Sequence, residues 1–166
     1  MQNFSRYTKP LVLLVCFLLL FLLQSTDLLT IRPLYASAFL LFPFTVTFCM
    51  FCDEITAAVT GLSVGIFLDS LSTAAGGFHT LFFLLMGLAV SFILHFLFNN
   101  NLRSALLLSL SLGILYYLLR CILFDVSHGF FEDAAHYIFR SALPSLIYTN
   151  LFTIPFYYFH RALAKK

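Results

Sequence analysis

The sequence predicts an all-α integral membrane protein, in which residues 1–166 form one domain of six transmembrane helices with both termini in the cytoplasm. Two observations indicate this fold class. Of the 166 residues, 61% are hydrophobic and only 10% are charged, with a mean hydropathy of +0.99, whereas soluble domains carry about 25% charged residues. The few charges also divide the chain into six apolar runs, and a helix needs roughly 20 residues to cross the hydrocarbon core. A soluble globular or disordered protein is therefore excluded.

The predicted helices follow these apolar runs, at about residues 10–26, 34–52, 55–71, 78–98, 102–124 and 135–160. Pro10 suits the start of the first helix, and Pro43 lies inside the second, where it predicts a kink. The third run has only 14 uncharged residues, which rise about 21 Å, so we expect this helix to be tilted or covered by its neighbours. The connecting loops are short, and we expect no domain outside the membrane.

Basic residues are distributed unevenly between the two ends of the predicted bundle. With six crossings, six of the nine cations fall on one side, and they are Arg6, Lys9, Arg103, Arg161, Lys165 and Lys166. Only Arg32 lies in a loop on the opposite side. Because loops rich in Lys and Arg remain in the cytoplasm, this asymmetry predicts that both termini are cytoplasmic. The net charge of +2 says little about partners, and no nucleic-acid partner is expected.

Small residues recur at every fourth position of the third predicted helix, at Ala57, Gly61 and Gly65, and Asp69 follows at the same spacing. Residues four apart share one face of a helix. Because small side chains let membrane helices approach closely, this small-residue stripe predicts a tight helix contact. The contact is either packing within the bundle, which the residues favour, or a docking face for another protein.

Asp69 is the most informative ionisable residue, because it lies at the rim of the membrane on the predicted outer side. A carboxylate there needs a partner. Arg120 and Arg140 lie at about the same depth near the outer ends of the fifth and sixth helices, and an ion pair with Arg120 is the preferred pairing. Alternatively, Asp69 caps the turn that follows it, while both arginines extend outward to lipid phosphates. The two interpretations carry equal weight.

The other residue patterns give little support for a redox, metal-binding or catalytic role. Cys49 and Cys52 form a C-x-x-C pair at the predicted cytoplasmic end of the second helix, where a reducing compartment disfavours a redox role. His128, Glu132 and His136 share a four-residue spacing, but the glycine between the first two weakens a helical interpretation. The sequence also lacks the phosphate-loop, nucleophile-elbow and zincin motifs. We therefore expect no enzyme activity, no cofactor and no metal ion.

The stretch GLSVGIFLDSLSTAAGGFHTL, at residues 61–81, resembles the signature of the MreD family, the small membrane proteins of the bacterial rod-shape system. The stretch opens with Gly61, and the positions that match the family motif are Gly65, Asp69, Ser72, Gly77 and His79. Gly76 departs from the pattern, because the family often has a larger apolar residue there. Chain length and the six hydrophobic segments also fit, so the resemblance extends over essentially the whole chain.

The resemblance implies a fold like the substrate-binding S-component of energy-coupling-factor vitamin transporters. It also implies a non-enzymatic role in the bacterial cytoplasmic membrane, in a cell-wall elongation complex with MreC, the actin-like MreB and peptidoglycan synthases. An alternative from the transport class is an S-component that binds a vitamin or metabolite in a pocket between the last three helices. A third, enzymatic hypothesis uses Asp69 and His79 as acid and base on a lipid-linked substrate, although no nucleophile or metal set accompanies them.

Overall fold

The computed structural model describes residues 2–26, 30–31, 36–37, 39–71, 76–96, 100–126 and 142–165. These residues are almost entirely helical, which confirms the all-α prediction. The helices are α1 (Gln2–Ser25), α2 (Leu41–Cys49), α3 (Glu54–Leu71), α4 (Phe78–Phe96), α5 (Leu102–Arg120), its π-helical continuation η3 (Cys121–Val126), α7 (Leu143–Leu151) and α8 (Thr153–Lys165). A short antiparallel ladder pairs β1 (Thr30–Ile31) with β2 (Ala36–Ser37), with Thr30 opposite Ser37.

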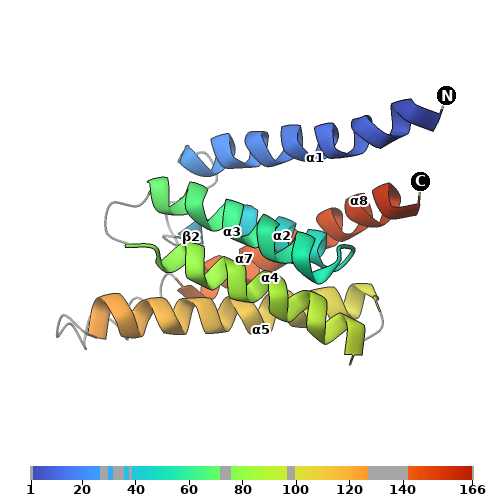
Figure 1. Ribbon diagram of the computed structural model, residues 1–166. Helices are drawn as coiled ribbons and strands as arrows, with labels where there is room; N and C mark the ends of the chain where they lie inside the picture. The colour runs from blue at the N-terminus through green and yellow to red at the C-terminus, as the bar shows by residue number, and fades with distance from the viewer. Residues whose placement is uncertain are drawn as a thin grey trace.

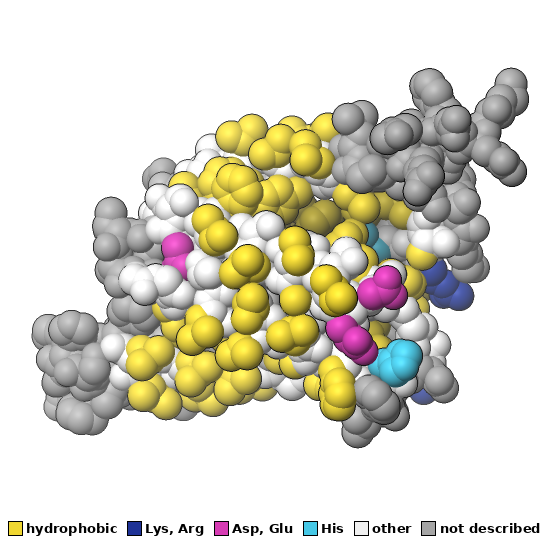
Figure 2. All heavy atoms as spheres, viewed as in Figure 1, with side chains coloured by type: hydrophobic (Ala, Val, Ile, Leu, Met, Phe, Trp, Pro, Cys, Tyr) yellow, Lys and Arg dark blue, Asp and Glu magenta, His cyan; other side chains and the backbone are white. Residues whose placement is uncertain are grey.

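Three helical segments are long and apolar enough to cross a membrane, namely Glu54–Leu71, Phe78–His95 and Leu102–Leu123. A shorter apolar segment, Val12–Ser25, belongs to α1. Hydrophobic side chains also cover much of the surface of these helices (Figure 2), as contact with lipid requires. The start of α1 and the end of α8 lie at the same end of the molecule (Figure 1). Six crossings and a cytoplasmic location of that end remain predictions.

Helix α2 differs most from its predicted form, because it begins at Leu41 and has nine residues, whereas the sequence predicts a start near residue 34. Pro43 is therefore the third residue of the helix and lies in its first turn. A first-turn N–H has no partner within a helix, so proline is tolerated there without bending the chain. Pro43 thus lies near the start of α2, and the kink expected inside a long second helix does not arise.

The sixth predicted helix is divided into α7 and α8 at Phe152. Pro155 has no N–H to donate to the carbonyl of Leu151, four residues earlier, so the regular ladder is interrupted at this point. Just before this point, the Phe152 N–H donates to the Thr149 carbonyl, three residues back and not four, at 3.1 Å. Residues 135–141, the expected start of this helix, lie outside the described part of the chain.

The core surrounds α2, where eight of the nine residues are buried. Helices α3, α4, α5, α7 and α8 all contact it, and α1 packs against it from one side. A helix that is apolar on all sides belongs in the interior. Its two internal hydroxyls are satisfied locally, because Thr45 donates to the Leu41 carbonyl at 2.6 Å and Thr47 donates to the Pro43 carbonyl at 2.7 Å.

Candidate functional site

The small-residue stripe of α3 packs against α4, and these two antiparallel helices share the most extensive contact in the described structure (Figure 1). Ala57, Gly61 and Gly65 are all buried. A Cβ atom at Gly61 would overlap the Phe83 carbonyl oxygen, and one at Gly65 would overlap the backbone of Thr80. The glycines therefore let the two backbones touch. Of the two interpretations of the stripe, the structure fits internal packing, because α4 covers the face on which a partner would dock.

A glycine of α4 that sequence reasoning missed completes this contact. A Cβ atom at Gly87 would overlap the carbonyl oxygen of Ala57. The contacts join position 57 to 87, 61 to 83 and 65 to 79–80, so the register advances by four on one helix as it retreats by about four on the other. Antiparallel helices that share one face require this register. The signal was present in the sequence, since Gly87 is the one glycine within residues 78–98.

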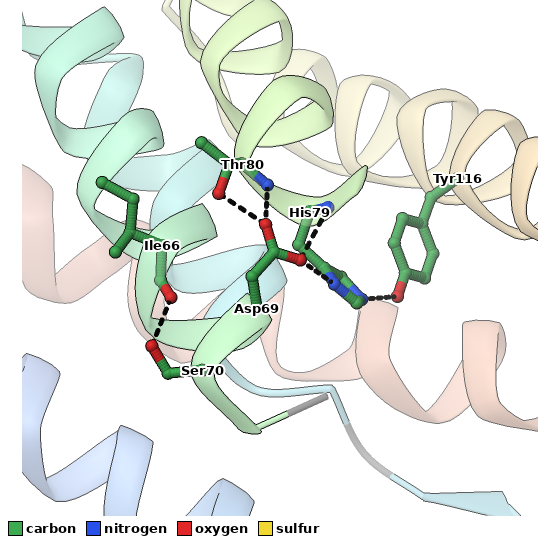
Figure 3. A network of polar contacts seen from close by, with 6 residues as sticks. All are labelled: Ile66, Asp69, Ser70, His79, Thr80 and Tyr116. Carbon is green, nitrogen blue, oxygen red and sulfur yellow. Dashed lines mark hydrogen bonds and ion pairs between the residues drawn. The ribbon is translucent and has the colours of Figure 1, made fainter. Parts of the chain in front are cut away.

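Asp69 ends the stripe and binds the start of α4 (Figure 3). Its Oδ1 accepts hydrogen bonds from the His79 backbone N–H at 3.2 Å and from His79 Nδ1 at 2.8 Å. Its Oδ2 accepts from the Thr80 backbone N–H at 2.9 Å and from the Thr80 hydroxyl. The first N–H groups of a helix have no partner within it, and the positive end of the helix dipole favours a carboxylate. Asp69 is thus a cap for α4 that is supplied by another helix.

His79 extends this cap to a third helix. Its Nε2 lies 3.1 Å from the hydroxyl oxygen of Tyr116 on α5. Because Nδ1 faces a carboxylate, it carries a hydrogen, and the Tyr116 hydroxyl is the hydrogen-bond partner of Nε2. Tyr116 is only 4% exposed and its ring packs among Phe39 and Phe82. We call Asp69, His79, Thr80 and Tyr116 the Asp69 network.

The turn that leads into α4 needs two left-handed residues. Gly76 has a φ of +46° and Gly77 a φ of +89°, a region that residues with a Cβ atom rarely adopt. The glycine at position 76, which departs from the family pattern, therefore suits the positive φ angle of the backbone there. Ser72, the remaining motif residue, lies outside the described residues.

The structure brings Asp69 together with His79 and Thr80, and not with Arg120. Both carboxylate oxygens are engaged by these two residues, and Arg120 lies in the last turn of α5 with an exposed side chain. Arg140 lies outside the described residues. The arrangement resembles the capping alternative, and the backbone that Asp69 caps is the start of α4. The arginines predicted as partners are distant in sequence, whereas the actual partners of Asp69 are only ten and eleven residues away, across one turn.

This geometry suits structural support better than acid–base chemistry. The Asp69 carboxylate already accepts from four donors, and the side chains of Asp69 and His79 are only 16% and 14% exposed. A general base must be able to reach the proton it abstracts, so Asp69 would have to release α4 first. Among the described residues, no three His, Cys, Asp or Glu side chains are grouped to hold a metal ion. His128, Glu132 and His136 lie outside that part.

The Cys49 and Cys52 thiols are both unpaired, and Cys49 is buried. Cys52 lies in the turn between α2 and α3, where burial, together with the negative charge of Asp53, raises the pKa of its thiol to about 11. A thiolate is the reactive form of cysteine, and redox motifs lower the thiol pKa. The environment of Cys52 therefore acts against a redox role.

The space between α5 and α7 is too small for a metabolite. A cavity there, lined by residues that include Phe42, Gly113 and Leu146, has a volume of about 10 Å³, which is close to the minimum for one water molecule. Small-molecule sites enclose roughly 300–1,000 Å³. The described residues thus offer no vitamin-sized pocket at this position.

Comparison with known proteins adds one decisive observation. A family model for the rod shape-determining protein MreD matches residues 5–166, nearly the whole chain. The chain belongs to the MreD family. The match confirms the resemblance drawn from residues 61–81, and with the apolar helices it identifies an integral membrane protein of a shape-determining family. Neither the curated proteins nor the solved structures include a match, so the likeness to S-components remains a prediction.

Proposed function

We propose that this protein is a non-enzymatic, six-pass scaffold of the bacterial cytoplasmic membrane that supports cell-wall elongation. In this role it links MreC, the MreB-associated complex and peptidoglycan synthases through its helix faces and short loops. The observation that carries the proposal is the family match over residues 5–166. The apolar helices of the described residues are consistent with recognition by helix packing, because helices in lipid associate through shape and a few polar contacts.

The Asp69 network supports a scaffolding role in a specific way. It ties the end of α3, the start of α4 and the C-terminal part of α5 together by hydrogen bonds, and the glycine contacts fix the spacing of α3 and α4. A partner would then meet a surface whose geometry is already set, which lowers the entropy lost on binding. In this proposal the family motif preserves the shape of the partner surface and is not itself the contact.

Depletion of the host MreD in a rod-shaped bacterium tests the proposal, with this chain or its variants supplied in its place. We expect the unsubstituted chain to restore rod shape and to co-purify MreC from solubilised membranes. Asp69→Ala should give round cells and lose MreC. Ser70→Ala is the matched control, because the exposed Ser70 hydroxyl only donates to the Ile66 carbonyl of its own helix, at 2.9 Å.

Abundance in the membrane must be measured for each variant, because a loss of folded protein would also round the cells. If Asp69→Ala retained rod shape and full recovery of MreC at normal abundance, the network would not support the partner surface. If the unsubstituted chain, expressed and inserted normally, neither restored shape nor bound MreC, the scaffolding function itself would be rejected.

A further inference from the structure

Three buried polar side chains on one face of α8 attach this helix to the rest of the bundle. Thr153, Tyr157 and His160 are four and three residues apart, which places them on the same side of a helix, and none is more than 3% exposed. The Thr153 hydroxyl lies 3.1 Å from the Ser109 hydroxyl of α5, and the Tyr157 O–H donates to the Asn100 carbonyl at 3.1 Å. We call Thr153, Tyr157 and His160 the α8 seam.

His160, the last residue of the α8 seam, holds α8 against α2. Its Nδ1 lies 3.0 Å from the Thr47 hydroxyl oxygen. Its ring packs on Phe44 and Phe48 of α2 and on Phe159 beside it. Because the other two residues of the seam lie nearer the start of α8, His160 is the polar contact that holds the C-terminal half of the helix in place.

The second ring nitrogen of His160 has no partner. Within the described residues, Nε2 is a buried atom that makes no hydrogen bond. A neutral imidazole carries a hydrogen on one nitrogen, whereas the protonated ring carries hydrogens on both. Whichever nitrogen is protonated in the neutral ring, the charged ring therefore has an N–H at Nε2 that faces no acceptor. Aromatic rings attract a cation far less than water does, so the surrounding phenylalanines do not offset this cost.

The helices around His160 carry no negative charge. Helices α2, α5 and α7 pack against α8, and none of the four contains an aspartate or a glutamate. The same is true of α1, which packs against α2. The charged side chains of α2, α5, α7 and α8 are all basic, and they are Arg103, Arg120, Arg161 and Lys165. Their other titratable groups are a thiol and phenols, which are ordinarily uncharged at neutral pH; they are Cys49, Tyr116, Tyr117, Tyr148, Tyr157 and Tyr158.

The carboxylates that follow α2 in the sequence belong to a different part of the surface. Asp53 and Glu54 are exposed and line a recess together with Ser91 and His95 of α4. Neither forms an ion pair with His160. A protonated His160 would therefore gain no ion pair in its buried position, and the charges on the helices packed around it would repel it.

The break between α7 and α8 allows α8 to move separately. Pro155 interrupts the hydrogen-bond ladder between the two helices, and the ends of helices are where hinge motions are absorbed. Thr153 lies beside this break, whereas His160 lies about two turns further along α8. Loss of the His160 contact should therefore free the C-terminal half of α8, which reaches the end of the molecule where the chain terminates (Figure 1).

We propose that His160 is a proton-sensitive switch that controls the attachment of α8 to α2. Near neutral pH the imidazole is uncharged and holds the C-terminal half of α8 in place. When the ring binds a proton, it must reach water or another acceptor, and α8 leaves α2 by tilting about Phe152. The switch belongs to the fold of this chain and does not depend on which proteins bind the scaffold.

The attachment of α8 should weaken as the pH falls, because the detached helix binds a proton that the attached helix excludes. An accessible histidine is half protonated near pH 6.5. Proton binding then multiplies the population of detached helix by about 1.1 at pH 7.5 and by about 11 at pH 5.5. We therefore expect the detached population to rise about tenfold between these two pH values.

Amide hydrogen exchange of the purified full chain, followed by mass spectrometry, tests the proposal. The chain is embedded in nanodiscs of phosphatidylcholine, and its exchange at pH 7.5 and at pH 5.5 is corrected for the chemical effect of pH on the exchange reaction. Local opening of a helix exposes its amides to exchange. We expect residues 157–165 to exchange about tenfold faster at pH 5.5, and residues 81–94 of α4 to show no change.

Two substitutions at position 160 remove the proposed switch. His160→Phe and His160→Gln both place a side chain there that is uncharged at either pH, so exchange of residues 157–165 should no longer depend on pH. His95→Phe is the matched control, because His95 is an exposed histidine near the end of α4. Its replacement should leave the pH dependence of α8 as it is in the unsubstituted chain.

Three results would overturn the proposal. The first is equal corrected exchange of residues 157–165 at the two pH values in the unsubstituted chain. The second is a pH dependence that persists in both His160 variants, because another group would then be responsible. The third is a rise in the exchange of α4 by the same factor, which would mean that acid loosens the whole fold. If neither His160 variant folds, the comparison of α8 with α4 in the unsubstituted chain decides the outcome.

Discussion

The two faces of α3 make opposite kinds of contact. Toward α4 the side chains are absent or small, the backbones touch, and Asp69 closes the contact with hydrogen bonds. Toward α1 the contact consists of large rings, in which Phe67 meets Phe17 and Phe21 edge-on at centroid distances of 5.3 Å, and a groove remains beside them. One face of α3 is therefore in tight contact with α4, whereas the other face leaves a space beside α1.

The difference shows how a helix pair becomes rigid in lipid. Without a hydrophobic driving force between helices, close packing and hydrogen bonds must supply the stability. The α3 and α4 contact has both, because glycines every four residues allow the approach and the hydrogen-bonded Asp69 carboxylate fixes the register. The α1 contact has neither. We therefore expect substitutions on the α4 side to affect folding and those on the α1 side to affect only the attachment of α1.

The largest effect is expected for Gly65→Leu. A Cβ atom at this position already overlaps the backbone of Thr80, and backbone cannot move aside as a side chain can, so the cost should reach at least about 3 kcal/mol. Thermal unfolding of the purified protein, followed by fluorescence-detected gel filtration, measures it. Ser70→Leu, on the exposed side of the same helix, is the control and should unfold near the unsubstituted temperature. Equal melting of the two variants would contradict the tight-contact description.

Asp69→Ala should destabilise the protein by about 2 kcal/mol. The substitution leaves the His79 and Thr80 N–H groups at the start of α4 without their acceptor, which combines the loss of a helix cap with the loss of charged hydrogen bonds. The same unfolding assay measures the change. Asp69→Asn retains a single acceptor oxygen, so its stability should lie between that of Asp69→Ala and that of the unsubstituted protein. An Asp69→Ala protein as stable as the unsubstituted one would show that the cap is dispensable.

Tyr116→Phe tests the outermost link of the network. It removes one hydrogen bond to His79 Nε2 and preserves the ring packing, so we expect a loss of about 1 kcal/mol. In the double variant with Asp69→Ala the two effects should not add, because His79 links the two groups. Strict additivity in this double-mutant cycle would mean that Tyr116 acts independently of Asp69.

Phe67→Ala should have the smallest effect on overall stability, about 0.5–1 kcal/mol, because it removes only edge-on ring contacts with α1. It should nevertheless have the largest effect on α1. A cysteine cross-link between α1 and α3 would form less efficiently in this variant, while one between α3 and α4 would be unchanged. If both cross-links weakened together, the two faces of α3 would not be independent.

Several site features were already indicated by local sequence, and others were not. The spacing of Ala57, Gly61 and Gly65 predicts a close contact from the chain alone, because spacing along a helix determines which residues share a face. Gly87 stands out in the sequence as the one glycine within residues 78–98, but only the folded structure pairs it with Ala57. Pro43 carried a usable signal, since proline prefers the first turn of a helix, but the long apolar run around it suggested a longer helix.

The membrane character, the helical class and the family could all be predicted from the amino-acid sequence, because hydropathy, periodicity and motif are properties of neighbouring residues. The packing of the helices determines that α4 covers the small-residue stripe, and it brings Asp69 to His79 and Thr80 instead of Arg120. It also decided that α1 stands apart over a groove. These outcomes depend on distances between separate segments, and a hydrogen bond tolerates errors of only a few tenths of an ångström, which residue spacing cannot specify.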